Sequence, residues 1–308
     1  MNQDIHTERA IKSWLFLILL ALIWGSSFIL IKKGLLVFSA GEVGAYRIVS
    51  AGLVLLPLSL PRLKTLNKRQ VWNLIIVGLV GSFIPAFLFA EAQTQLSSSL
   101  TGVLNALTPL FVVIVGAVFF NSTITRRNGI GLLIAFIGVG ILITVRAGGG
   151  FGTFSQINVY AFLVLLATLC YGINLNLIKY WFVVLKPVDI TSISLLMVLP
   201  AASMYLFIAT DFSFKLVHVE GGYLAAGYLT ILGVVGTAFA LIIFNILVKI
   251  ATPVFASTVT YLIPIVAIVW GVLDGEVLLL GHYLGILAVI IGVWIGNRKG
   301  GVKVVPAR

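Results

Sequence analysis

Long runs of apolar residues alternate along the whole chain with short stretches that hold charged residues, glycine, proline or asparagine. A helix that crosses a lipid bilayer needs roughly 20 mostly apolar residues. The pattern therefore predicts ten membrane-spanning helices, and the loops between them are too short for a soluble domain. The predicted spans are residues 13–36, 42–60, 71–92, 97–120, 127–145, 157–181, 189–210, 221–247, 252–273 and 279–296. We expect an all-α integral membrane protein.

The amino-acid composition agrees with membrane embedding. Of the 308 residues, 60% are hydrophobic and 9% are charged, whereas soluble domains contain about 45–50% and about 25%. A net charge of +11 elsewhere indicates a nucleic-acid partner, but here most basic residues flank apolar runs, so no such partner is predicted. Because Cys170 is the single cysteine and the three histidines are far apart in sequence, neither a disulfide framework nor a Cys/His metal centre is expected. No cofactor is predicted.

The distribution of lysine and arginine predicts the orientation in the membrane. An even number of spans places both termini on one side, and that side holds most of the basic residues. They are Arg9, Lys12, Arg62, Lys64, Lys68, Arg69, Arg126, Arg127, Lys179, Lys186, Lys249, Arg298, Lys299, Lys303 and Arg308. The opposite side holds Lys32, Lys33, Arg146 and Lys215, and Arg47 lies inside a span. The positive-inside rule therefore predicts a multi-pass protein of the cell (inner) membrane with both termini in the cytoplasm.

The second half of the chain repeats the first at a nearly constant offset. The matches 155 residues apart are Gly78 with Gly233, Gly81 with Gly236, Pro109 with Pro264 and Gly116 with Gly271. Nearer the ends of each half, the matches are Trp24 with Tyr171, Lys32 with Lys179, Gly131 with Gly285 and Gly138 with Gly292. The constant order of these positions, with one proline in each of two similar helices, indicates an internal repeat.

Each half holds five predicted spans, and this odd number forces the second half to enter the membrane from the opposite face. We therefore expect two inverted repeats related by a pseudo-two-fold axis in the membrane plane. The predicted domains are a first repeat at residues 1–147, a linker at 148–156, a second repeat at 157–297 and a basic cytoplasmic tail at 298–308. Inverted halves that share a central cavity are typical of secondary transporters that work by alternating access.

Short motifs in these spans carry a family resemblance. The first span contains Trp24-Gly25-Ser26-Ser27-Phe28, the second contains Arg47 after a Gly-Glu-Val-Gly lead, the fourth contains the stretch from Ser97 to Phe111, and the ninth closes on Asp274-Gly275-Glu276. Together with the five-plus-five arrangement, they resemble the EamA family of the drug/metabolite transporter superfamily over nearly the whole chain. The resemblance implies a ten-helix inner-membrane carrier, often an exporter of amino acids, related metabolites or toxic organic compounds. One departure is Asn121, which stands in the first half where the second has Glu276.

Polar residues inside the spans are the candidates for substrate binding, because polar groups in a bilayer usually face the bundle interior or a water-filled cavity. Trp24 and Ser27 share a helix face, as do Tyr171 and Asn174, and polar stripes mark the fourth and ninth spans. The candidates are Trp24, Ser27, Arg47, Asn105, Thr108, Tyr171, Asn174, Asn245, Thr260 and Tyr261. The alternative is that these side chains hydrogen-bond between packed helices without contacting substrate.

Two prolines lie at matching positions inside predicted spans. Pro109 and Pro264 each remove one backbone hydrogen bond and free a carbonyl group. We interpret both as hinge candidates.

Four charged residues lie within the predicted spans or near their ends. Arg47 either extends its side chain to the outer interface or faces inward, where it suits a substrate carboxylate or an acid such as Glu91. Glu91 is either an interfacial residue or the proton-coupling group, since a carboxylate partly removed from water exchanges protons more readily near neutral pH. Lys32 and Lys33 are interpreted as interfacial anchors, and the match of Lys32 with Lys179 leaves a role at the helix end as the alternative.

The sequence as a whole predicts a secondary transporter, an exporter of amino acids or related small metabolites, with proton coupling and facilitated transport both open. A multidrug or organic-cation exporter on the same fold, a membrane-embedded enzyme acting on lipid-linked substrates, and a channel are the alternatives. The spans hold no cluster of His, Asp and Glu and no nucleotide-binding motif, which argues against an enzyme and a primary pump. The expected partners are a small-molecule substrate, the lipid bilayer and protons, and no oligomeric state is predicted.

Overall fold

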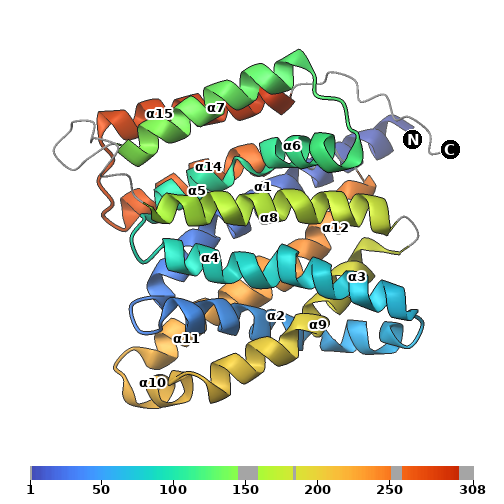
Figure 1. The fold of residues 1–308 in the computed structure, drawn as a ribbon, viewed down its shortest axis with the longest axis vertical. Helices are drawn as coiled ribbons and strands as arrows, with labels where there is room; N and C mark the ends of the chain where they lie inside the picture. Colours follow the sequence, from blue (N-terminus) through green and yellow to red (C-terminus); the bar gives the residue numbers. More distant parts are fainter. Residues whose placement is uncertain (1, 145–158, 183–184, 251–258, 298–308) are drawn as a thin grey trace.

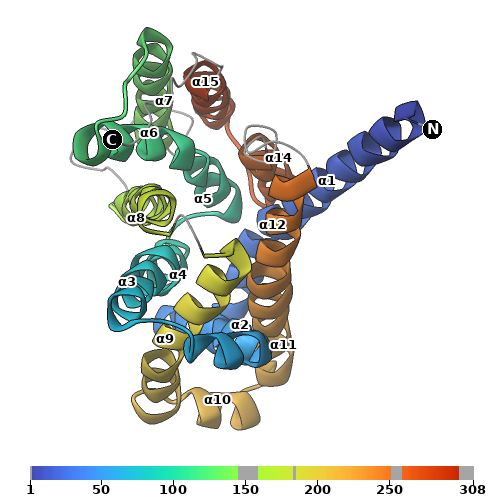
Figure 2. The same cartoon turned by 90° about the vertical axis from the view of Figure 1, so that its right-hand side faces the viewer.

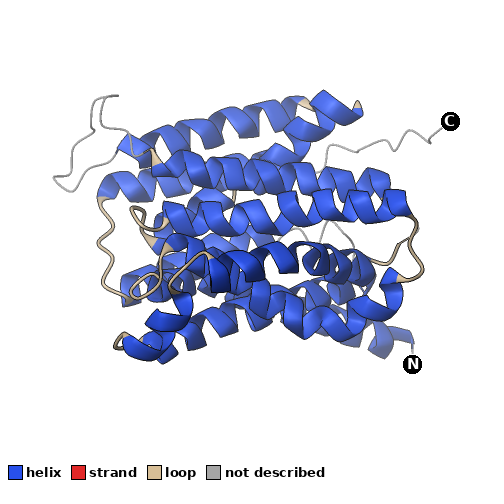
Figure 3. Cartoon of the chain, turned by 60° about the horizontal axis from the view of Figure 1, so that its bottom comes forward, coloured by secondary structure: helices blue, strands red, loops and turns tan. Residues whose placement is uncertain are grey.

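The computed structural model describes residues 2–144, 159–182, 185–250 and 259–297. In these ranges helices are joined by loops and turns, and no strand occurs (Figure 3). Most of the helices run roughly along one direction, and α1 begins on the same side of the bundle as α15 ends (Figure 1). The prediction of an all-α protein is confirmed.

The helices of the first half follow the predicted apolar runs closely. They are α1 (Asn2–Gly34), α2 (Ala40–Leu63), α3 (Lys68–Gly78), α4 (Ile84–Ala92), α5 (Ser98–Asn105), α6 (Thr108–Phe120) and α7 (Arg126–Thr144). Helix α1 starts well before the predicted boundary at residue 13, because its polar first turns continue the apolar helix.

The helices of the second half are distributed in a similar way. They are α8 (Tyr160–Trp181), α9 (Pro187–Ile208), α10 (Phe212–His218), α11 (Gly222–Gly233), α12 (Ala240–Ile250), α14 (Val259–Leu273) and α15 (Leu280–Asn297). The short helix α10 was not predicted and lies in the connection between α9 and α11. The predicted linker, the whole basic tail and the start of the ninth span lie outside the described residues.

Within the described ranges, seven helical segments are long and apolar enough to cross a membrane. They are Ile11–Gly34, Ala40–Leu63, Lys68–Ala92, Ser98–Phe120, Tyr160–Trp181, Pro187–Ile208 and Gly222–Phe244. Two shorter apolar helices, Val259–Leu273 and Leu280–Gly296, accompany them. Ten spans in two inverted repeats remain a prediction.

Two π-helical segments interrupt otherwise continuous spans. The segment η1 (Leu79–Phe83) joins α3 to α4, and η3 (Val234–Phe239) joins α11 to α12. Their first residues lie 155 positions apart, the same offset that relates the matched glycines. In a π segment each backbone hydrogen bond spans five residues instead of the four of an α-helix. Such segments often occur at functional sites.

The fourth predicted span is broken where Pro109 requires it. Proline has no N–H group, so the Asn105 carbonyl loses its usual donor four residues on. The Thr108 hydroxyl donates to that carbonyl at 2.8 Å, and α5 ends at Asn105 while α6 begins at Thr108. Pro264 lies inside the continuous helix α14, so the two matched prolines have different local geometry.

Helix packing joins the two halves of the chain. In Figure 2, which looks along the bundle, α8 lies between α4 and α6, and α1 lies beside α14 and α12. Helices α7 and α15 form a close pair, in which Gly131 contacts Gly292 and Gly138 contacts Gly285 backbone to backbone. Small residues permit this close approach in apolar surroundings. The first helix of each half thus packs against spans of the other half.

Candidate functional site

Arg47 faces the interior of the bundle. A capping box between Ser39 and Glu42 starts α2, and Arg47 follows two turns later with its side chain half-buried. Its Nε donates to the Thr237 hydroxyl at 3.2 Å, and its guanidinium also interacts with the Tyr171 hydroxyl. The inward alternative is therefore the observed one, and the side chain does not extend to the outer interface.

Thr237 reaches Arg47 because it belongs to η3. Its hydroxyl also contacts the Leu232 carbonyl, five residues earlier, at 3.4 Å, a spacing that the π segment provides. The sequence reasoning missed Thr237. The available signal was its neighbour Gly236, which matches Gly81 in the repeat.

Trp24 and Ser27 lie against the same π segment. The Trp24 indole Nε1 donates to the Gly236 carbonyl at 3.0 Å, and its ring contacts Phe244 at 5.5 Å between centroids. The Ser27 hydroxyl donates to the Ile23 carbonyl and lies 3.2 Å from the place where a Cβ on Gly236 would stand. Both candidates therefore share one face of α1, as predicted, and that face packs on η3.

Asn174 has the corresponding relationship to η1. A Cβ on Gly81 would lie 2.5 Å from the Asn174 amide group, so only glycine leaves room for that side chain. The Asn174 Oδ1 atom is buried and has no hydrogen-bond partner among the described residues. Ser27 with Gly236 and Asn174 with Gly81 are thus equivalent pairs, each joining the first helix of one half to a π segment of the other.

Tyr171 connects Arg47 to the remaining aromatic residues. It stands one turn before Asn174 on α8, so both side chains lie on one face. Its ring stacks on Phe89 of α4 with centroids 5.8 Å apart. The structure therefore brings Arg47, Thr237, Tyr171 and Asn174 into one neighbourhood formed by α2, η3, α8 and η1.

The other candidates occupy different places. Asn105 ends α5 with its Oδ1 buried and without a hydrogen-bond partner in the described part of the chain, and the Thr108 hydroxyl is used by the helix break. Thr260 and Tyr261 are half-buried in the first turn of α14. The side chain of Asn245 lies outside the described residues.

Glu91 stands apart from this neighbourhood. It occupies the last turn of α4, and its side chain is exposed. Within the described ranges no carboxylate forms an ion pair with Arg47, so the predicted pairing of Glu91 with Arg47 is not found. No group of three or more His, Cys, Asp or Glu residues there is placed to hold a metal ion.

Comparison with known proteins decides the family. The family model of the EamA-like transporter family matches residues 11–144 and 158–298. The chain belongs to this family. Membership and the apolar helical fold identify a membrane transporter, in agreement with the prediction that the protein is not an enzyme.

Relatives of this EamA-family chain include proteins that are named as transporters. An uncharacterized transporter of Archaeoglobus fulgidus is 26% identical over 295 residues, which cover 94% of this chain and 99% of that protein. The uncharacterized inner membrane transporter YedA of Escherichia coli is 26% identical over 281 residues, covering 89% and 87%. A solved structure titled "Crystal structure of protein" superposes with a TM-score of 0.61 at 16% identity, covering 92% of this chain and 95% of that one, and this likeness concerns the fold alone.

Proposed function

We propose that this chain is a secondary transporter that exports amino acids or related carboxylate-bearing metabolites by alternating access. The observation that carries the proposal is the inward-facing guanidinium of Arg47, beside Tyr171 and Thr237 and without an acidic partner in the described residues. A charge inside a membrane bundle is costly and usually marks a substrate or ion pathway.

A carboxylate is the ligand that best completes this arrangement. The guanidinium presents a planar fork of donors that matches the two oxygens of a carboxylate. Its other contacts are to neutral hydroxyl groups, which leave its charge uncompensated. An anionic substrate group would supply the missing charge at the moment of binding.

The unpartnered oxygen of Asn174 favours an amino group on the same substrate. Oδ1 is an acceptor, and a buried acceptor without a donor costs free energy until one arrives. An ammonium group offers three donors. A zwitterion that places its carboxylate on Arg47 and its ammonium on Asn174 would satisfy both residues, which is why amino acids are the proposed class.

The proposed architecture is ten spans in two inverted five-helix repeats. Its support is the equal offset of η1 and η3, together with the equivalent pairs of Ser27 with Gly236 and Asn174 with Gly81. In each pair, the first helix of one half contacts the π segment of the other half. Such reciprocal contacts suit two halves that rock against each other around a midplane site.

Orientation and coupling complete the proposal. The distribution of basic residues supports cytoplasmic termini in the inner membrane. Proton coupling through Glu91 is retained as part of the proposal, with Pro109 and Pro264 as hinges. The relative YedA carries the words inner membrane transporter in its own name.

The test is uptake into liposomes that contain the purified full-length protein. Labelled amino acids are compared with their decarboxylated amines, and Arg47→Gln with Arg47→Lys. We expect saturable transport of the amino acids alone, with a loss of about tenfold or more in Arg47→Gln, since hydrogen bonds to charged groups are worth about 1.5–3 kcal/mol. Equal transport of the amines, or full activity of Arg47→Gln, would contradict the proposal and favour an organic-cation exporter.

A further inference from the structure

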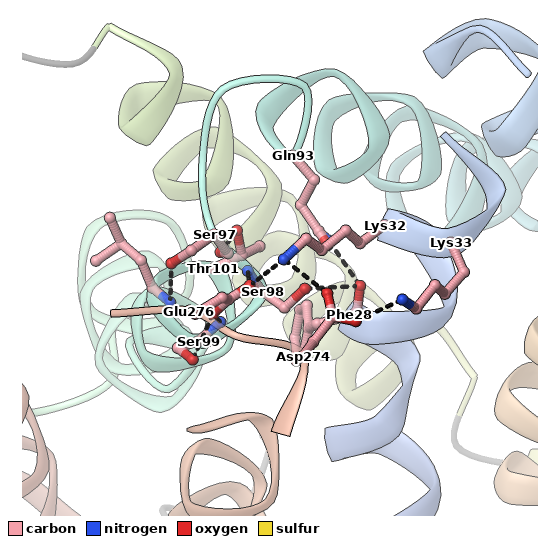
Figure 4. A network of polar contacts seen from close by, with 11 residues as sticks. Phe28, Lys32, Lys33, Gln93, Ser97, Ser98, Ser99, Thr101, Asp274 and Glu276 are labelled. Atoms are coloured by element: carbon pink, nitrogen blue, oxygen red, sulfur yellow. Dashed lines mark hydrogen bonds and ion pairs between the residues drawn. The ribbon is translucent and has the colours of Figure 1, made fainter. Parts of the chain in front are cut away.

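Four charged residues meet at the end of the bundle where α1 finishes (Figure 4). Lys32 Nζ lies 2.9 Å from Asp274 Oδ2 and 3.0 Å from Glu276 Oε1, and Lys33 forms an ion pair with Asp274. The lysines belong to the first half of the chain, whereas the acids follow α14 in the second half. We call this end of the bundle the Lys32 end.

Glu276 also holds the start of α5. Its carboxylate accepts from the Ser98 N–H at 2.8 Å, the Ser99 N–H at 3.1 Å and the Ser99 hydroxyl at 2.7 Å. A negative charge is favourable at a helix N-terminus. With 6% of its side chain exposed, this carboxylate joins α1, α5 and the loop after α14.

Surrounding contacts tighten the same arrangement. The Ser98 hydroxyl and the Gln93 amide both donate to the Phe28 carbonyl, at 3.3 Å and 3.1 Å, which ties the loop before α5 to α1. A Cβ on Gly271 would clash with the Glu276 carboxylate and the Ser99 hydroxyl, so α14 approaches α5 only through glycine.

The opposite end of the bundle, where α6 and α8 finish, has an uncharged counterpart. Asn121 and Gly275 have left-handed backbone with φ of 52° and 84°. Each is followed by a residue whose N–H donates back into the preceding helix, Ser122 to Gly116 and Glu276 to Gly271, both at 2.9 Å. The residues at this turn, Asn121 and Ser122, are both uncharged, and the Asn121 N–H also donates to the Gly116 carbonyl, so the first half has no carboxylate where the second half has Glu276.

The Ser122 hydroxyl contacts the Tyr180 hydroxyl. Tyr180 directly follows Lys179, which is the residue that matches Lys32 in the repeat. The two hydroxyl oxygens lie 3.2 Å apart at this Tyr180 end. Another contact between the halves there is the ion pair of Arg62 with Asp189, which is long at 3.8 Å and has Arg62 53% exposed. The Lys32 end adds a further short pair, Lys215 with the buried Glu42 at 2.8 Å.

We propose that Lys32, Lys33, Asp274 and Glu276 form an electrostatic latch that closes the transport path at the Lys32 end. The inference rests on the proposed alternating access, in which opening one end separates the helices that pack there. Helices α1 and α5 must then part from the loop after α14, and the Lys32–Glu276 contact must break.

The two ends differ in what opening requires. Breaking the ion pair leaves the buried Glu276 carboxylate without its lysine partner, which is more costly than separating two exposed hydroxyls that water can satisfy. The latch therefore biases the resting protein toward a conformation that is closed at the Lys32 end. In the proposed topology this is the outer end.

The experiment measures the distance between two spin labels in the full-length protein in liposomes, with Cys170→Ala to remove the native thiol. Labels at Leu36 and Val277 report on the Lys32 end, since both side chains are largely exposed there. Labels at Thr123 and Trp181 report on the Tyr180 end. We expect Lys32→Met or Glu276→Gln to raise the open-to-closed ratio for Leu36–Val277 at least about fivefold, a typical conformational coupling.

Matched controls address folding and specificity. Lys32→Met/Glu276→Gln should shift the distance by less than the sum of the two single effects, because both variants remove the shared Lys32–Glu276 contact. Gly271→Ala should act in the same direction through its clash. Arg62→Gln and Tyr180→Phe alter contacts at the other end, and both should leave the Leu36–Val277 distances unchanged.

A measurement that leaves the four latch residues unsubstituted guards against latch variants that fail to fold. Raising the salt concentration to about 1 M screens partly exposed charges, so the unsubstituted latch should open more often. Unchanged Leu36–Val277 distances in folded variants and at high salt would overturn the latch even if amino-acid uptake is intact. Responsive distances without any amino-acid uptake would instead leave the latch standing and contradict the proposed substrate.

Discussion

Arg47 of α2 donates a hydrogen bond to Thr237 in η3, with 3.2 Å between Nε and Oγ1. The contact crosses between the two halves of the chain and holds a guanidinium inside the bundle. It depends on the π segment, because that segment presents the threonine hydroxyl to α2.

Thr237→Val tests the role of this contact. The substitution keeps the side-chain shape and removes the hydroxyl partner of the charged Arg47 guanidinium, so substrate affinity should fall by about tenfold or more, since a hydrogen bond to a charged group is worth about 1.5–3 kcal/mol. Thr230→Val is the matched control, since Thr230 lies in α11, just before η3, and its hydroxyl pairs with Tyr46 of α2 instead of Arg47. Equal effects of the two variants on affinity would remove Thr237 from the site.

Gly81→Ala tests the packing of Asn174 on η1. A methyl group at this position meets the Asn174 amide, and overpacking of this kind costs about 1–3 kcal/mol. We expect a lower melting temperature and slower uptake. Gly227→Ala on α11, where a Cβ meets no atom within 4 Å, should neither lower the melting temperature nor slow uptake.

Glu91→Gln tests proton coupling. If Glu91 exchanges the coupled proton, the variant transports without any dependence on an imposed pH gradient, because glutamine cannot release a proton. Uptake is measured with and without the gradient, and Glu220→Gln, at the start of the turn before α11, serves as control. A gradient response that survives in Glu91→Gln assigns coupling to another group.

Pro109→Ala tests the hinge. Alanine restores the N–H that the Asn105 carbonyl lacks, so α5 and α6 should join and the melting temperature should rise. Transport should slow if bending at the break is part of the cycle. Pro264→Ala lies in a helix that is already continuous and should affect the rate less. Faster or unchanged transport in Pro109→Ala would exclude the hinge.

The latch should be insensitive to mild acid. Asp274 and Glu276 face Lys32 and Lys33 of α1 and the Ser98–Ser99 turn of α5. Hydrogen bonds from Lys32 and Lys33 lower the pKa of Asp274. Burial by itself raises the pKa of Glu276, but hydrogen bonds from Ser99, Lys32 and Ser98 outweigh it, so the pKa of Glu276 is also lowered.

The sign of the pH effect follows from these shifts. The ordinary pKa of these carboxyl groups is about 4. Above that pH, a carboxyl group whose pKa is lowered in the latch stabilises the latched state fully. This contribution is lost as the pH falls through the lowered pKa. The Leu36–Val277 distances should therefore stay constant between about pH 5.5 and about pH 8. Opening within that range would show that another titrating group controls this end.

The helices could be predicted because their signal is local. A bilayer requires each span to satisfy its own backbone hydrogen bonds, so apolar runs of sufficient length become helices wherever they occur. The shared faces of Trp24 with Ser27 and Tyr171 with Asn174 follow from helical spacing in the same way. Which neighbour each face meets does not follow from spacing.

Tertiary structure decided the partners. Sequence alone left Arg47 between the interface and the interior, missed Thr237, and interpreted Lys32 and Lys33 as interfacial anchors although they pair with Asp274 and Glu276. Each of these contacts joins residues more than 150 positions apart. Hydropathy along the chain determined that this protein is a helical membrane protein. The packing of one half against the other decided which charges are paired, because an ion pair or hydrogen bond forms only where two distant helices bring its atoms within about 3 Å.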